Sequence, residues 1–158
     1  MHNINLIVLI TFIINLGCIL LGENMELNKQ FVERHYYGLA TFENFWGKKI
    51  KKISLGHTAM LFGVGMLNEY ILEDIPNEGI VKDCFGFKYY LGVGSDMWHI
   101  EFWTEDGEYY KSSYNFYCNL TASDNGKVIM GINGESKRLY LDFPSSANCS
   151  TQINRINE

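Results

Sequence analysis

The sequence predicts an all-β fold, a flattened antiparallel β-barrel of about eight or nine strands. The chain has 15 glycines against two prolines, and 15% of its residues are aromatic. Several short runs alternate apolar and polar residues with a period of two, as strands with one buried face do. Turns rich in Gly, Asn and Asp separate these runs, and long stretches with helical periodicity are scarce.

The amino-terminal stretch 4–21 is almost wholly apolar and predicts a secretory signal peptide. Cleavage near Gly22 assigns 1–22 to the signal and 23–150 to one β-rich domain. An uncleaved signal anchor is the alternative. We expect the polar residues 151–158 to form a frayed tail.

The first half of the mature chain gives less regular signals than the second half. A short helix competes with a strand only at 25–37, where apolar residues have helical spacing. We expect extended structure at 41–46 and 49–55, and one buried strand with a glycine bend at 57–68. The inward face of 69–75 is not defined by its pattern, and Pro76-Asn77-Glu78-Gly79 predicts a turn.

The second half alternates clearly, and the alternation divides the residues of each strand between two faces. An Asp106-Gly107 turn predicts a hairpin between two of these strands. The residues that share a face within a strand are Phe85, Phe87 and Tyr89; Trp98, Ile100 and Phe102; Tyr110, Ser112, Tyr114, Phe116 and Cys118; Val128, Met130 and Ile132; and Leu139, Leu141 and Phe143.

The charge of the chain argues against two classes of partner. Its formal net charge is −5 and its isoelectric point is near 5.4, which disfavour nucleic acid and anionic membranes. The basic run Lys48-Lys49-Ile50-Lys51-Lys52 is an exception that we interpret as solvated, because few apolar residues flank it. We expect membrane contact only through an uncleaved signal.

Four cysteines are present, and Cys18 falls in the predicted signal. The remaining three, Cys84, Cys118 and Cys149, allow one disulfide and one leftover thiol, or a bridge between chains. A covalent dimer through Cys84 is therefore one open alternative.

Two sequons, at Asn119 and Asn148, are compatible with glycosylation in the secretory pathway. Together with the predicted signal they indicate a secreted protein or one of the endoplasmic reticulum lumen. Asn119 is the better acceptor, since Asn148 is followed by a cysteine.

The chain carries none of the spacings typical of a nucleophilic, phosphate-binding or metal-dependent enzyme. His35, His57 and His99 lie on separate segments, and His99 with Glu101 offers two ligands where zinc requires three or four. We therefore expect a binding module rather than an enzyme, without a metal or other cofactor.

The carboxy-terminal third resembles the mannose-6-phosphate receptor homology (MRH) domain, in the form found in glucosidase II beta and GlcNAc-1-phosphotransferase gamma subunits. A strand ends in Cys118, a turn-rich connection follows, and then come Glu135, Tyr140 and Ala147-Asn148-Cys149. The hairpin Trp103-Thr104-Glu105-Asp106-Gly107-Glu108 is also similar. The resemblance covers 84–150 and implies an MRH-like barrel with a Cys118–Cys149 disulfide; both cysteines of the family's second bridge are missing.

The resemblance also implies a sugar site that is incomplete in this chain. The family holds mannose with Gln, Arg, Glu and Tyr, of which Glu135 and Tyr140 have counterparts here. The position of the arginine falls on Tyr110, so Lys111 is its nearest substitute, and no glutamine occurs between Phe85 and Lys111. We expect lectin-like binding of a mannose-type N-glycan or a glycoprotein through Glu135, Tyr140 and Lys111.

Two other functions stay open. A small lipocalin-like carrier would use the run 57–68 and the many aromatic residues to line an apolar cavity. A secreted effector would instead contact a protein partner through a sheet face that carries His99, Glu101 and Trp103.

Overall fold

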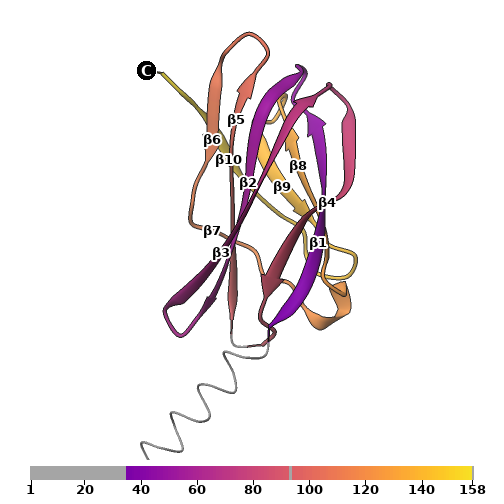
Figure 1. Ribbon diagram of the computed structural model, residues 1–158, viewed down its shortest axis with the longest axis vertical. Coiled ribbons are helices and arrows are strands. Elements are labelled where there is room, and N and C mark those ends of the chain that lie inside the picture. The colour runs from indigo at the N-terminus through magenta and orange to yellow at the C-terminus, as the bar shows by residue number, and fades with distance from the viewer. Residues whose placement is uncertain (1–34, 93, 158) are drawn as a thin grey trace, which may run out of the picture. The chain divides into compact units, whose positions relative to one another are not determined.

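The computed structural model describes residues 35–92 and 94–157, which belong to one compact unit. This unit is built almost entirely of strands, as Figure 1 shows. The elements are β1 (Tyr36–Phe45), β2 (Ile50–Leu61), β3 (Val64–Ile75), β4 (Gly79–Tyr89), β5 (Ser95–Thr104), β6 (Tyr109–Ser112), β7 (Phe116–Tyr117), the 3₁₀ helix η1 (Ala122–Asp124), β8 (Lys127–Asn133), β9 (Arg138–Asp142) and β10 (Cys149–Ile156).

Nine strands form one curved sheet in the order β3-β2-β5-β6-β10-β9-β8-β1-β4, and β7 pairs with β5 beside it. The predicted flattened barrel is confirmed. The two edge strands meet through side chains: Asn68 accepts a hydrogen bond from the Lys88 amide at 3.4 Å, and the rings of Tyr70 and Phe85 stack. The barrel is therefore nearly closed, with a seam between β3 and β4.

One pairing differs from the antiparallel prediction, because β1 and β8 run parallel, with Leu39 opposite Lys127 and Phe45 opposite Asn133. Alternation within a strand defines its two faces but carries no information on the direction of a neighbour that is distant in sequence. The parallel pair thus depends on tertiary structure alone.

Four of the five predicted faces lie in the core. The fifth is wrong in part, because the strand expected from Tyr110 to Cys118 is broken after Ser112 by a turn, in which Tyr114 is 53% exposed. Fully buried side chains from six strands, among them Phe42, Ile53, Phe85, Phe87, Trp98, Phe102, Met130, Ile132 and Leu139, fill the interior of the barrel. Their rings contact one another, as Phe87 does with Trp98 at a centroid distance of 5.1 Å. These packed side chains occupy the interior that a lipocalin-like carrier would leave for its ligand.

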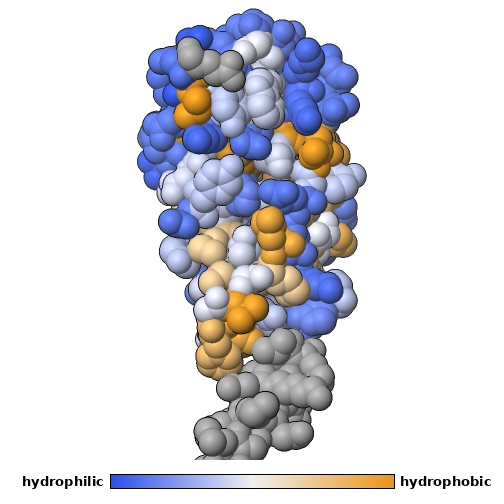
Figure 2. All heavy atoms as spheres, turned by 60° about the vertical axis from the view of Figure 1, so that its left-hand side comes forward, coloured by the Kyte–Doolittle hydropathy of each residue, from blue (hydrophilic) through white to orange (hydrophobic). Residues whose placement is uncertain are grey.

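The single buried strand expected at 57–68 is wrong, because this run is a hairpin. Phe62 (φ 49°) and Gly63 (φ 80°) turn the chain between β2 and β3. Beyond the turn, Val64 and Leu67 are 68% and 56% exposed, so the apolar run does not stay in the core. Figure 2 shows apolar residues gathered toward this end of the barrel, whereas hydrophilic residues cover the opposite end.

The frayed tail predicted for 151–158 is also wrong. β10 lies in the middle of the sheet, where Thr151 pairs with Leu139 of β9 and Ile153 pairs with Ser112 of β6. Ile153 is 2% exposed. Its polar neighbours point outward, so the low average hydropathy of this segment concealed a strand with one buried residue on its inner face.

The Cys118–Cys149 disulfide is confirmed, and it joins β10 to the segment before η1 across 31 residues. Such a bond is compatible with a secreted or secretory-lumen protein. Cys84 is a free, half-buried thiol on β4.

The predicted signal at 1–22 lies outside the described residues, as does most of the helix considered at 25–37; Tyr36 and Tyr37 begin β1 instead. Within the described part of the chain, no helix is both long and apolar enough to cross a membrane.

Candidate functional site

The three predicted sugar ligands lie on separate elements. Glu135 is exposed in the turn between β8 and β9, Tyr140 is on β9, and Lys111 is on β6. On the intervening β10, Tyr140 pairs with Ser150 and Lys111 pairs with Asn154. These two partners are four residues apart, about 13 Å along the strand. None of the three side chains lines either of the two surface hollows described below.

Tyr140 already has a partner on the outer face of the sheet. Its ring lies across Gly131, where an added Cβ would be 2.0 Å from the ring, and its hydroxyl donates to Glu43 of β1 at 2.8 Å. Burial and this hydrogen bond raise the pKa of Tyr140 above its ordinary value.

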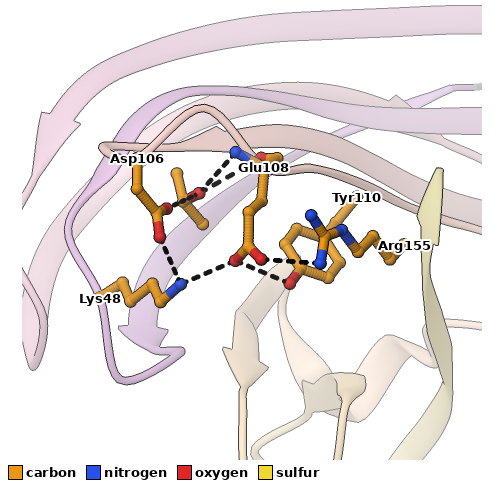
Figure 3. Close-up of polar contacts among 6 residues, drawn as sticks. Lys48, Asp106, Glu108, Tyr110 and Arg155 are labelled. Carbon is orange, nitrogen blue, oxygen red and sulfur yellow. Dashed lines mark hydrogen bonds and ion pairs between the residues drawn. The ribbon is translucent and has the colours of Figure 1, made fainter. Parts of the chain in front are cut away.

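A charged cluster stands at the end of the barrel that carries the β5–β6 hairpin (Figure 3). Lys48 contacts Asp106 at 2.6 Å and Glu108 at 2.7 Å. Glu108 also pairs with Arg155 of β10 at 2.9 Å and accepts a hydrogen bond from the Tyr110 hydroxyl at 3.0 Å. Three segments far apart in sequence therefore meet at one carboxylate.

The local sequence builds each part of this cluster. Gly107 has φ +85°, which a glycine adopts without strain, and so the hairpin turns directly between its two acidic residues. Asn44, which is fully buried, donates to the carbonyls of Lys48, Ile75 and Pro76 and thereby fixes the β1–β2 loop. This brace holds Lys48 opposite the hairpin.

The mutual contacts fix the charges of the cluster. Hydrogen bonds to Asp106 and Glu108 raise the pKa of Lys48 above its ordinary value. The same lysine lowers the pKa of both carboxyl groups. With Arg155 the cluster carries two positive and two negative charges near neutral pH, so its local net charge is zero.

A hollow of about 300 Å³ lies beside this cluster and is open to solvent. Two of its lining residues, Trp103 and Tyr109, stack with ring centroids 4.5 Å apart and an interplanar angle of 13°. The complete lining is Trp103, Gly107, Glu108, Tyr109, Arg155, Ile156 and Asn157. An aromatic pair, a carboxylate, a guanidinium and an amide thus border one small surface site.

Sequence reasoning missed this hollow because Arg155 and Asn157 fall in the segment expected to fray. Ile153 between polar neighbours was the signal that this segment is a strand. Trp103 was noticed as part of a possible protein-binding face and as the first residue of the MRH-like hairpin, but not as part of a hollow.

His57 and His99 lie on opposite faces of the sheet. His57 is fully buried and bonds Asp96 at 2.9 Å inside the core. His99 lies on the outer face above Gly56 and is 3.7 Å from Glu69. Within residues 35–92 and 94–157, no group of three or more His, Cys, Asp or Glu side chains is placed to hold a metal ion.

No model of a known protein family matches the chain, and no curated protein matches its sequence. The geometry of the hollow and its chemistry are therefore the basis for a function.

Proposed function

We propose that this chain is a lectin-like binding module of the secretory pathway, which recognises a neutral mannose-type glycan in the hollow beside the β5–β6 hairpin. The observation that carries the proposal is the union, in one hollow, of the stacked Trp103–Tyr109 pair with Glu108 and Arg155. The sequence resemblance to MRH domains supports the same ligand class by a separate route.

The lining matches the two surfaces of a sugar ring. The C–H face of a pyranose is apolar and packs on an indole or phenol ring. Its hydroxyl groups both donate and accept, so a carboxylate, a guanidinium and an amide bind adjacent hydroxyls in complementary ways. Arg155 has a side chain 56% exposed and that of Glu108 is 20% exposed, which leaves polar atoms accessible at the rim.

The zero net charge of the cluster favours a neutral sugar over a phosphorylated one. Lys48 and Arg155 are each paired with a carboxylate, so neither is a cation without a counter-charge. A phosphate would have to compete with Asp106 and Glu108 for these cations.

The secretory location rests on the predicted signal and the sequons. Asn119 and Asn148 are both exposed, as a glycan acceptor must be. The location is tested by expression in a secretory host and digestion of the product with a glycosidase. A glycosylated chain should migrate faster on a gel after the digestion.

Binding is tested by titrating the chain with mannose oligosaccharides in a calorimeter, with competition by free mannose. Trp103→Ala should weaken binding about tenfold, the equivalent of about 1.4 kcal/mol from ring contacts. Tyr117→Ala is the matched control, because Tyr117 is 60% exposed and lies outside the hollow.

Glu135→Ala distinguishes the hollow from the sugar site that the resemblance implies. If the hollow binds the glycan, this variant keeps its affinity, whereas the alternative site predicts that it loses binding. The proposal fails if no mannose glycan binds, or if Trp103→Ala binds as well as the unmodified chain does.

A further inference from the structure

A second hollow, also of about 300 Å³ and open to solvent, lies on the outer face of the β1–β8–β9 part of the sheet. It shares no residue with the hollow at the hairpin. Its lining is Leu39, Thr41, Asp83, Lys127, Val128, Ile129, Asp142, Phe143 and Pro144. The volume is at the lower end of the range for small-molecule sites.

Most of this lining is apolar. Leu39 remains 40% exposed, and Val128 and Phe143, which belong to the core, form part of the floor. Pro144 follows the end of β9 and lies beside them. An apolar group that enters the hollow would therefore remove from water both its own hydrocarbon surface and that of the lining.

Of the charged side chains that line the hollow, two form an ion pair with each other and one does not. Asp83 forms an ion pair with Lys127 at 3.0 Å, so these two charges cancel. The Asp142 side chain is half-buried, and its carboxylate has no hydrogen bond or ion pair within the described ranges 35–92 and 94–157. Burial and the nearby Glu43 carboxylate raise the pKa of Asp142 above its ordinary value.

The register of the strands explains this position. Thr41, Ile129 and Asp142 are opposite one another across β1, β8 and β9, and Glu43, Gly131 and Tyr140 form the adjacent row. The Tyr140 hydroxyl donates to Glu43, which satisfies one oxygen without supplying positive charge. The hollow thus has an apolar floor beside two carboxylates that lack a cation.

We propose that this hollow binds a small organic cation, an amine with an apolar body, whose ammonium group pairs with Asp142 and whose hydrocarbon part packs on Leu39, Ile129 and Phe143. The ammonium supplies the charge that the protein leaves out, and the charge-assisted hydrogen bond gives the site its selectivity. Binding of this kind is independent of glycan recognition at the other hollow.

The test uses three probes of nearly equal shape: 2-phenylethylamine, which is cationic, 2-phenylethanol, which is neutral, and phenylacetate, which is anionic. Each is titrated into the isotopically labelled full chain, and affinity is read from amide chemical shifts. The amine should bind at least tenfold more tightly than the alcohol, with shifts at 39–41, 127–129 and 142–144, and the acid should not bind. Equal binding of amine and alcohol would overturn the proposal.

Asp142→Asn should reduce affinity for 2-phenylethylamine at least tenfold, whereas Glu73→Gln, which makes the same change of charge at an exposed position on β3, should leave it unchanged. Asp142→Asn should be at least as stable to urea as the parent, because the ionised carboxylate gains nothing from its surroundings. For the unmodified chain, amine affinity should fall as the pH is lowered through the titration of Asp142. Equal losses in both variants, or a pH-independent affinity, would refute a specific ion pair.

Discussion

Removal of the Cys118–Cys149 disulfide should destabilise the barrel by an amount that can be calculated from the structure. The bond closes a loop across 31 residues. In the chain-entropy model, a loop of this size contributes about 3.7 kcal/mol at 25 °C by restricting the unfolded chain. For a unit of this size, such a loss lowers the melting temperature by roughly 10–20 °C.

The perturbation is the double variant Cys118→Ala/Cys149→Ala, since Cys118 is 4% exposed and a serine there would bury a hydroxyl group. The assay is urea unfolding followed by tryptophan fluorescence, with the free energy extrapolated to zero urea. Cys84→Ala is the control, because this thiol is free and only half-buried. It should cost less than about 1.5 kcal/mol.

A loss below about 1 kcal/mol in the double variant would contradict the loop-closure argument. Peptide mapping should find Cys84 unpaired in the folded, oxidised protein. A bridge from Cys84 to either of the other two cysteines would refute the pairing itself.

Asn44→Ala should cost about 3 kcal/mol or more in urea unfolding, because it leaves three carbonyls and the Trp46 amide without their side-chain partner. Burial lowers the pKa of His99, so the unfolded chain binds more protons than the folded chain as the pH falls. The free energy of unfolding should therefore be highest above about pH 6.5 with respect to this residue and decrease at lower pH. His99→Gln should make this decrease smaller. Burial alone would raise the pKa of Asp124, but hydrogen bonds from Ser146 and Thr121 outweigh it and lower the pKa. Its contribution to stability is complete above about pH 4 and decreases as the pH is lowered toward the folded-state pKa, so Asp124→Asn should be less stable than the parent at pH 7, by a difference that shrinks below pH 4.

Much of the fold was predictable because burial on one face leaves a period of two in the sequence. The alternation placed Phe85 with Phe87, and Trp98 with Phe102, on the same face of their strands, and all four are buried. The same method gave the wrong result for 57–68, where both strands of the hairpin are rich in apolar residues and the pattern did not mark the turn at Phe62 and Gly63.

The candidate site was predictable only in part. The Asp106-Gly107 turn was evident from the sequence, and so was the presence of Trp103 ahead of it. Neither Lys48 nor Arg155 could be joined to that hairpin, because each is separated from it by tens of residues in the chain. Arg155 reaches the hairpin because β10 lies beside β6, and Lys48 reaches it because β2, which begins just after Lys48, lies beside β5.

The sequence by itself determined that the protein is all-β and which residues share a face in most strands of its second half. Those properties are local, since each depends on the period of a short segment. The tertiary structure alone decided the parallel pairing of β1 with β8, the central place of β10 and the position of both hollows. These features depend on which distant strands become neighbours, and that choice minimises the free energy of the whole barrel rather than of any one strand.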